Sequence, residues 1–221
     1  MTGYIISFSF VSIIILIATI LGKLKKVGIE GTRKLVHISV SNWWFIAMLY
    51  FVNPISASVV PFCFIIINYL SYKKQLFSAI ERGEGKKDLG TVYYSVSLFL
   101  LVLLTFSLNK PEIGLLGILI MGYGDGFAAL VGKKWGTKPL AFNKNKTVEG
   151  SITVFILSII ITFLILTYYY PQVSLNIALL ISLSMGVFAF LIEALTPNGF
   201  DNLTLPLITS GIFYYIVNNL I

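Results

Sequence analysis

Charged side chains are scarce in this sequence. Asp, Glu, Lys and Arg make up 11% of its 221 residues, whereas 57% are hydrophobic and the mean hydropathy is +0.90. A soluble domain carries about 25% charged residues, so this chain lacks the polar surface that water requires. The shortage excludes a water-soluble globular protein and predicts an integral membrane protein.

Cysteine is almost absent as well. The single Cys63 lies within an apolar run, which excludes an internal disulfide and a cysteine-based metal site and indicates a packing role. The net charge of +7 does not indicate a nucleic-acid partner, because its distribution along the chain fits a membrane surface and phosphate ligands better.

Long runs without any charged residue define the predicted fold. Turns at Pro54 and Pro171 divide the two longest runs, 35–72 and 150–192. Because a membrane span needs about 20 apolar residues, each half is long enough to cross a bilayer. The sequence predicts an all-α polytopic protein, a single transmembrane domain over residues 1–221 with eight spanning helices. These helices cover residues 4–22, 35–52, 55–72, 90–108, 112–131, 150–170, 174–193 and 202–219.

Basic residues predict the orientation in the membrane. Fifteen of the sixteen lie in the loops after the first, third and fifth predicted helices, and only Lys110 lies on the other side. The positive-inside rule places these loops in the cytosol and both termini outside. The fifteen are Lys23, Lys25, Lys26, Arg33, Lys34, Lys73, Lys74, Arg82, Lys86, Lys87, Lys133, Lys134, Lys138, Lys144 and Lys146.

Acidic residues gather on the same side, which the positive-inside rule does not require. Eight of the nine lie there or at the helix ends that reach it, and Glu112 is the exception. A channel or carrier is expected to place polar groups through the depth of the membrane. The one-sided pattern favours an enzyme that acts at the cytosolic interface on a lipid, with a lipid transporter or flippase as the non-enzyme alternative.

The strongest motif is Gly122-Tyr-Gly124-Asp125-Gly126, which continues into Gly132-Lys133-Lys-Trp-Gly136. An Asp on an apolar helix is costly and usually functional, and glycines allow a phosphate, a metal or another backbone to approach closely. The simpler alternative is that Asp125 reaches the interface or pairs with a loop lysine.

A second motif, Lys146-Thr147-Val-Glu149-Gly150-Ser151, leads into the sixth predicted helix. Lys146 is a flexible cation suited to phosphate oxygens, and the start of the helix could hold an anion. The alternative is an ordinary basic loop in which Thr147 caps the helix.

Carboxylates also flank the last predicted loop, which contains no Lys or Arg. Glu193, Asp201 and Asn202 face the same side as the fifteen cations, a combination that suggests magnesium ligands. The alternative is a turn in which Asp201 caps the final helix.

Two further groups are ambiguous. Arg33 and His37, four residues apart, share one helix face, but Arg33 and Lys34 could simply anchor a helix end at the interface. Thr91 and Tyr94 open the fourth predicted helix, where tyrosines are common in any membrane protein.

Taken together, the motifs resemble the CTP-dependent lipid-alcohol kinases, which include dolichol kinase, phytol kinase and the fungal-type diacylglycerol kinase. The resemblance runs from about Arg33 to Pro206. It rests on Arg33-Lys34-Leu-Val-His37, Gly90-Thr91-Val-Tyr-Tyr94, Gly124-Asp125-Gly126-Phe-Ala, Gly132-Lys-Lys-Trp-Gly136, Lys146-Thr147-Val-Glu149-Gly150-Ser151 and Asp201-Asn202-Leu-Thr204-Leu-Pro206.

The resemblance implies a kinase that uses CTP and Mg²⁺ to phosphorylate the hydroxyl of a membrane lipid alcohol. It implies catalytic roles for Asp125, Lys146, Arg33 and Lys34, with Asp125 as magnesium ligand or hydroxyl-orienting base. The implied metal ligands are Asp125, Asp201 and Glu193. The implied nucleotide-binding residues are Gly124, Gly126, Gly132, Lys133, Lys138, Thr147, Glu149, Gly150, Ser151 and Asn202, while His37, Thr91 and Tyr94 have no assigned role.

The related phosphatidate cytidylyltransferases are the second enzymatic alternative. The sequence lacks their Pro-Gly-His-Gly-Gly and Asp-Arg-x-Asp patterns and has Asp201-Asn202-Leu-Thr204 instead, which argues for phosphate transfer to an alcohol. An isoprenoid alcohol is the preferred acceptor, with diacylglycerol as an alternative. Small-residue faces around Gly114, Gly117 and Gly186 predict close helix packing within one chain or between copies, so a homo-oligomer stays open.

Overall fold

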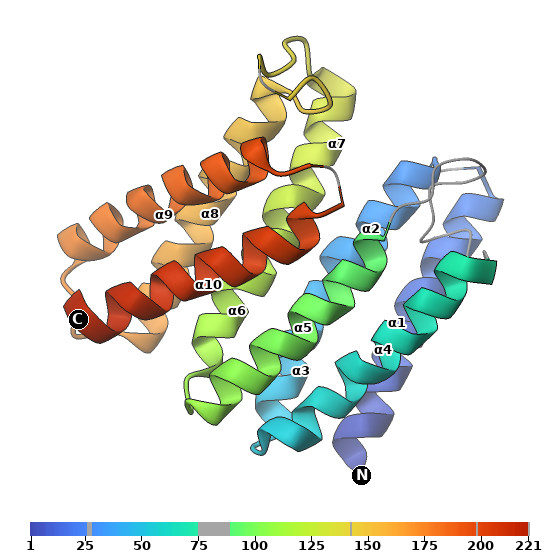
Figure 1. The fold of residues 1–221 in the computed structure, drawn as a ribbon, viewed down its shortest axis with the longest axis horizontal. Coiled ribbons are helices and arrows are strands. Elements are labelled where there is room, and N and C mark those ends of the chain that lie inside the picture. The colour runs from blue at the N-terminus through green and yellow to red at the C-terminus, as the bar shows by residue number, and fades with distance from the viewer. Residues whose placement is uncertain (26–27, 75–88, 142, 198, 221) are drawn as a thin grey trace. The chain divides into compact units, whose positions relative to one another are not determined.

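The computed structural model describes residues 1–25, 28–74, 89–141, 143–197 and 199–220 (Figure 1). In these ranges every element of regular secondary structure is a helix, and Pro139 and Thr147 form an isolated β-bridge. The all-α prediction is therefore confirmed. The described chain forms two compact units, Met1–Pro111 and Glu112–Ile221. Some of the predicted cytosolic charges lie outside the described residues, namely Lys26, Glu81, Arg82, Glu84, Lys86, Lys87 and Asp88.

The first unit contains two fully buried tryptophans. Trp43 and Trp44 at the start of α3 are buried, and Trp44 Nε1 donates to the Pro111 carbonyl oxygen at 3.0 Å. The Trp44 ring also meets Phe106 edge-on, with ring centroids 6.0 Å apart. The helices of this unit are α1 (Thr2–Lys23), α2 (Ile29–Ser41), α3 (Trp43–Tyr50), α4 (Pro54–Lys74) and α5 (Gly90–Ser107).

The predicted helix 35–52 is divided in the structure. It begins earlier, at Ile29, and breaks at Asn42 into α2 and α3. The Asn42 amide donates to the carbonyl oxygens of Ile38 and Ser39 at 3.2 and 3.3 Å. A side chain that bonds the preceding turn in this way competes with the helical ladder, which explains the break.

The second unit is built around α8 (Val148–Tyr169), which packs against α9 (Leu175–Leu195), against α7 (Gly126–Trp135) and against a π-helical segment, η1 (Ile120–Asp125). α6 (Pro111–Leu119), η1 and α7 follow one another without a loop, where the sequence predicts a single helix over 112–131. α10 (Asp201–Leu220) packs against both α9 and η1.

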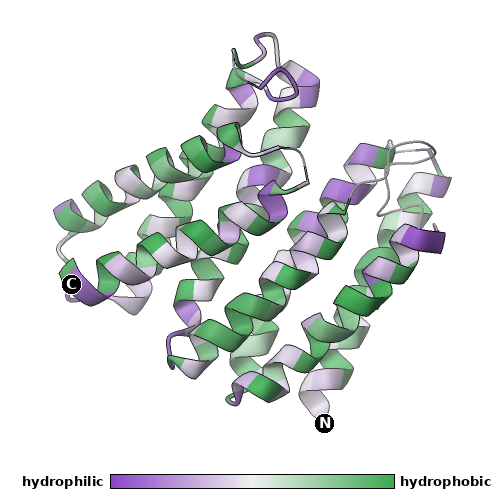
Figure 2. Ribbon diagram, in the orientation of Figure 1, coloured by the Kyte–Doolittle hydropathy of each residue, from purple (hydrophilic) through white to green (hydrophobic). Residues whose placement is uncertain are grey.

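The described helices fit a membrane by length and composition. Seven are long and apolar enough to span, counting α6, η1 and α7 as one, while residues 29–50 form the remaining predicted element as two shorter helices. Large apolar side chains are exposed along the middle of the helices; Leu180 on α9, for example, is 65% exposed. Figure 2 shows the helices mostly green, with the hydrophilic colour concentrated at helix ends and loops. The protein is therefore a polytopic membrane protein with a lipid-compatible surface.

A glycine allows α6 and α10 to approach closely. A Cβ atom built on Gly117 would lie 2.2 Å from Ser210 Oγ and 2.4 Å from the Pro206 carbonyl oxygen. Ser210 Oγ in turn donates to the Ile113 carbonyl oxygen at 3.0 Å, so the same contact also carries a hydrogen bond between the helices.

We expect Gly117→Ala to destabilise the protein, because the Pro206 backbone has to move to admit the methyl group. Overpacking of this kind costs about 1–3 kcal/mol, which a lower melting temperature in detergent would report. Gly211→Ala is the matched control on α10, since nothing lies within 4 Å of a Cβ built there. Equal melting temperatures for Gly117→Ala and wild type would contradict the described packing.

Candidate functional site

The π-helical segment carries Asp125. Asp125 is the last residue of η1 and only 6% exposed, and it lies between the buried glycines Gly124 and Gly126. π-helical turns are rare and occur frequently at functional sites. Because an ionisable residue on an apolar helix is usually functional, Asp125 stays the leading catalytic residue that the sequence predicts.

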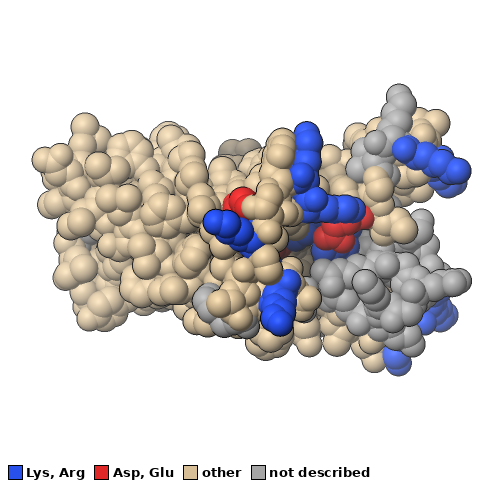
Figure 3. Space-filling model, turned by 90° about the horizontal axis from the view of Figure 1, so that it is seen from above, with Lys and Arg blue, Asp and Glu red and all other residues tan. Residues whose placement is uncertain are grey.

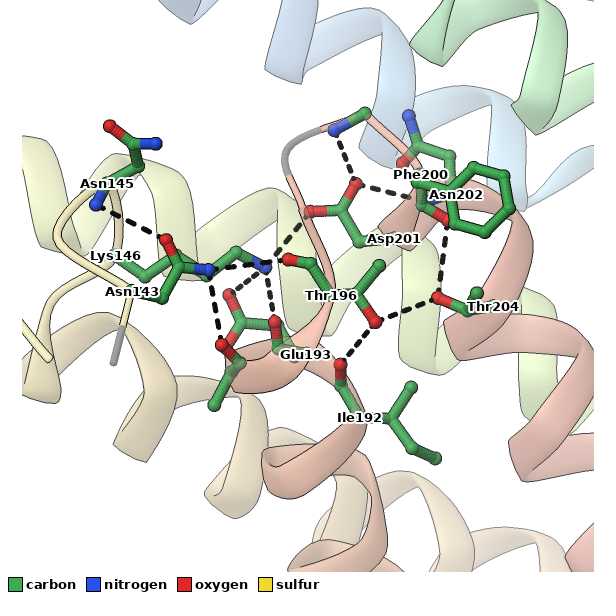
Figure 4. A network of polar contacts seen from close by, with 12 residues as sticks. Asn143, Asn145, Lys146, Ile192, Glu193, Thr196, Phe200, Asp201, Asn202 and Thr204 are labelled. Carbon is green, nitrogen blue, oxygen red and sulfur yellow. Dashed lines mark hydrogen bonds and ion pairs between the residues drawn. The ribbon is translucent and has the colours of Figure 1, made fainter. Parts of the chain in front are cut away.

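Lys146 lies at the centre of a buried ion cluster (Figure 4). Its Nζ is 2.8 Å from Glu193 Oε1 and 3.1 Å from Asp201 Oδ2, and it donates to the Glu193 carbonyl oxygen at 2.5 Å. All three side chains are buried. The structure thus brings together predicted residues from the 136–147 loop, the end of α9 and the start of α10.

Opposing effects act on the Lys146 amine. Burial favours the neutral form, but the nearby carboxylates of Asp201, Glu193 and Asp125 outweigh this and raise the pKa of Lys146 above its usual value. Lys146 is therefore protonated at neutral pH. The charge of Asp125 contributes to this increase in the pKa of Lys146 less than those of Asp201 and Glu193.

The carboxylate oxygens that do not contact Lys146 are also bonded. Ser151 Oγ donates to Glu193 Oε2 at 3.0 Å, and the backbone N–H groups of Gly199 and Asn202 donate to Asp201 Oδ1 at 3.1 and 3.0 Å. Gly199 has a φ of 88°, a left-handed conformation that favours glycine. Asp201 therefore orders the turn before α10, as the simpler interpretation predicted, and also faces Lys146, while its role as a magnesium ligand stays a prediction.

The loop that carries Lys146 is folded back on itself. Leu140 N donates to the Lys146 carbonyl oxygen and Val148 N donates to the Lys138 carbonyl oxygen, both at 2.9 Å. The Asn143 amide donates to the carbonyl oxygens of Ala194 and Thr196 at 3.2 and 3.4 Å, which attaches the loop to the end of α9. The sequence did not predict a role for Asn143, because its two partners on α9 and just after it lie far along the chain.

Glu149 also holds this loop. Its Oε1 accepts from the Thr137 backbone N at 3.0 Å and from Thr137 Oγ1 at 2.6 Å. Thr137 had no predicted role, and no sequence signal pairs it with Glu149. The observed contacts of Glu149 are thus structural, while its assignment to nucleotide binding remains a prediction.

Thr147 is surrounded by the glycines of the motifs. Its Oγ1 accepts from Gly150 N at 3.2 Å and caps α8, as the simpler interpretation of this motif predicted. Cβ atoms built on Gly132 and Gly136 would lie 2.7 Å from Thr147 side-chain atoms, and one on Gly150 would lie 2.9 Å from the Ala128 carbonyl oxygen. These glycines allow α7 and α8 to pack closely, and their nucleotide contacts remain predictions.

Two exposed lysines of the predicted nucleotide site precede Lys146 in the sequence. Lys133 and Lys138 are both exposed, so their ammonium groups are accessible to a ligand. Figure 3 shows basic side chains protruding on the face that it draws, with carboxylates among them. The exposed ammonium groups of Lys133 and Lys138 suit the binding of phosphate oxygens.

The remaining predicted residues lie in the first unit. Arg33, Lys34 and His37 are buried on α2, and Arg33 pairs with Glu30 through two hydrogen bonds, of 2.5 and 3.2 Å. Tyr94 of α5 donates from its hydroxyl to the His37 carbonyl oxygen at 3.1 Å, and its ring meets the imidazole edge-on.

Thr91 also lies on α5, where its carbonyl oxygen accepts from the Asn68 amide at 3.2 Å. This contact links α5 to α4 through the backbone, and the Thr91 side chain takes no part in it. The rings of His37 and Tyr94 pack against each other inside the first unit, while Thr91 contributes a backbone contact.

Magnesium fits the carboxylates of the ion cluster. The described residues contain no group of three His, Cys, Asp or Glu side chains that could hold a metal. Mg²⁺, however, is usually bound by one or two carboxylates together with phosphate oxygens and water. Glu193 and Asp201 supply such a pair.

Several known proteins that are similar to this chain are named as phytol kinases. A phytol kinase of Synechocystis sp. (strain ATCC 27184 / PCC 6803 / Kazusa) is 32% identical over 205 residues, which cover 90% of this chain and 84% of the relative. The chain belongs to the phytol kinase family of lipid-alcohol kinases.

More distant relatives agree with this family. A probable chloroplastic phytol kinase of Triticum aestivum is 31% identical, with 85% of this chain and 68% of the relative covered. A CTP-dependent diacylglycerol kinase of Saccharomyces cerevisiae is 28% identical, with 57% and 49% covered. No family model and no solved structure matches the sequence. The family confirms the predicted lipid-alcohol kinase and does not favour the cytidylyltransferase alternative.

We expect Glu149→Ala to loosen the 136–147 loop, because both Thr137 hydrogen bonds are lost. Two bonds of about 1 kcal/mol each predict roughly tenfold or greater acceleration of amide hydrogen exchange in that loop, measured by mass spectrometry. Glu149→Gln retains an acceptor oxygen and should exchange like the wild type. Slow exchange in Glu149→Ala would contradict the structural assignment, whereas slow exchange with lost nucleotide affinity in Glu149→Gln would indicate an additional, direct nucleotide contact.

Proposed function

We propose that this protein transfers the terminal phosphoryl group of CTP to the hydroxyl of phytol or a closely similar isoprenoid alcohol. The observation that carries the proposal is the buried cluster of Lys146, Glu193 and Asp201 at one end of lipid-compatible helices. The names of the phytol kinase relatives support the acceptor, and the yeast relative named as CTP-dependent supports the donor.

The proposed chemistry depends on position and charge. Phosphoryl transfer requires little covalent participation by the protein, and neutralisation of the phosphate oxygens dominates. Lys146, Lys133 and Lys138 would bind these oxygens, with Arg33 and Lys34 as further cations. The other proposed nucleotide contacts are Gly124, Gly126, Gly132, Thr147, Glu149, Gly150, Ser151 and Asn202.

The carboxylates would act on the metal and on the acceptor. Glu193 and Asp201 would hold Mg²⁺, which supplies neutralisation of the charge that develops during transfer. Asp125 would either join these ligands or accept a hydrogen bond from the lipid hydroxyl and orient it for attack. We further propose that the chain acts as one transmembrane domain, with the basic loops in the cytosol and both termini outside.

The direct test uses the purified protein in nanodiscs with Mg²⁺ and CTP labelled at the γ-phosphate. Phytol, geranylgeraniol, diacylglycerol and phosphatidate are offered separately, and the lipid extract is counted. We expect label in phytol or geranylgeraniol. Label in diacylglycerol alone would overturn the isoprenoid acceptor, and pyrophosphate release driven by phosphatidate would favour the cytidylyltransferase. Substrate flux in sealed vesicles without nucleotide turnover would favour a transporter.

Asp125→Asn should lower kcat by about 100-fold or more, because the amide keeps the shape but lacks the charge and basicity of the carboxylate. An unchanged melting temperature in detergent shows that the variant is folded. Glu112→Gln is the control, since Glu112 accepts a hydrogen bond from Tyr170 at 2.8 Å and has no proposed catalytic role. Near-normal turnover by folded Asp125→Asn would remove Asp125 from the mechanism.

A further inference from the structure

Three oxygen atoms converge on one point in the second unit. They are the Glu193 carbonyl oxygen, Glu193 Oε1 and Asp201 Oδ2, which lie 2.5, 2.8 and 3.1 Å from Lys146 Nζ. Carboxylate and carbonyl oxygens are also the ligands that hard divalent cations take in proteins. The ammonium of Lys146 therefore occupies a point whose surroundings suit a divalent cation.

The oxygens are held in place by groups other than Lys146. The second oxygen of Glu193 accepts from Ser151, and the second oxygen of Asp201 accepts from two backbone N–H groups. Such supporting hydrogen bonds orient the ligands of metal sites. The two carboxylates would thus keep their direction if the ammonium left.

Lys146 differs from its partners in how it is attached. Glu193 and Asp201 lie on helices, whereas Lys146 lies in the 136–147 loop at the end of a flexible four-carbon side chain. Its Nζ can move away by rotation of side-chain bonds while the loop keeps its contacts with α8 and α9.

We propose that the Lys146 ammonium holds the divalent-cation position until the metal and the nucleotide bind, and then moves to the phosphates. This proposal rests on the proposed function. One point cannot hold two cations, so Lys146 competes with a metal that arrives alone. A nucleotide offers the displaced ammonium a new anionic partner, which couples binding of the metal to binding of the nucleotide.

The test measures binding of Mn²⁺ alone, as a probe for Mg²⁺, to the full-length protein in detergent by electron paramagnetic resonance. Because the competing ammonium is removed, we expect Lys146→Met to bind Mn²⁺ about tenfold or more tightly than wild type. Mn²⁺ should also raise the melting temperature of Lys146→Met more than that of wild type. Lys144→Met, an exposed lysine of the same loop, should bind like wild type.

Further variants locate the metal. Lys146→Met with Glu193→Gln should lose the gained affinity, because one ligand is gone. If Lys146→Met does not fold, Lys146→Gln replaces it, since its neutral amide can still donate to the carboxylates. Unchanged or weaker Mn²⁺ binding in a folded Lys146 variant would overturn the proposal, as would a gain that survives Glu193→Gln.

The outcomes also separate this proposal from the proposed function. Labelled phytol formed by the wild type together with unchanged Mn²⁺ affinity in Lys146→Met would reject the displacement of Lys146 and leave the kinase intact. Tighter Mn²⁺ binding without phosphorylation of any lipid alcohol would retain the displacement and reject the kinase.

Discussion

The need to compensate buried charge governs the second unit. Glu193 and Asp201 are buried at the ends of apolar helices, where an isolated carboxylate would be strongly destabilising. The ammonium of Lys146 neutralises both and thereby joins the 136–147 loop to α9 and α10. Backbone N–H groups and Ser151 satisfy the remaining carboxylate oxygens. The buried cluster of Lys146, Glu193 and Asp201 can therefore exist inside a protein whose outer surface is largely apolar.

Close helix packing brings the charged groups into range of one another. Glycines remove side-chain volume where α6 meets α10, at Gly117, and where α7 meets α8, around Thr147. The π-helical segment then places Asp125 between these two contacts along the chain. Glycines of the motifs that suggested access for a phosphate therefore allow helices to approach closely in this structure.

The one-sided charge distribution suits a reaction between partners with opposite solvent preferences. A nucleotide stays in water, whereas a long-chain alcohol stays in the bilayer with its hydroxyl at the interface. Exposed Lys133 and Lys138 precede the cluster in sequence, and uncovered apolar side chains lie along the helices. Cations for a nucleotide and an apolar surface for a lipid fit the lipid-alcohol kinase family to which the chain belongs.

The sequence by itself determined the class of protein, most helix positions and the family, because hydropathy runs and short motifs are local properties. It predicted that Lys146, Glu193, Asp201 and Asp125 carry chemistry, since charges in apolar surroundings are visible in one dimension. Only the tertiary structure showed that Lys146 bonds residues 47 and 55 positions away. Such pairs follow from how helices pack, which leaves no periodic signal in the sequence.

The same limit applies to the two departures from regular helix. The break at Asn42 depends on side-chain hydrogen bonds that compete with the backbone hydrogen bonds of the helix. A hydropathy pattern does not reveal such bonds. The π-helical path through Ile120–Asp125 inserts extra backbone into an otherwise ordinary apolar run. Composition therefore predicted both segments as apolar helices, whereas side-chain hydrogen bonds at Asn42 and the π-helical turn at Ile120–Asp125 decided the backbone path that they follow.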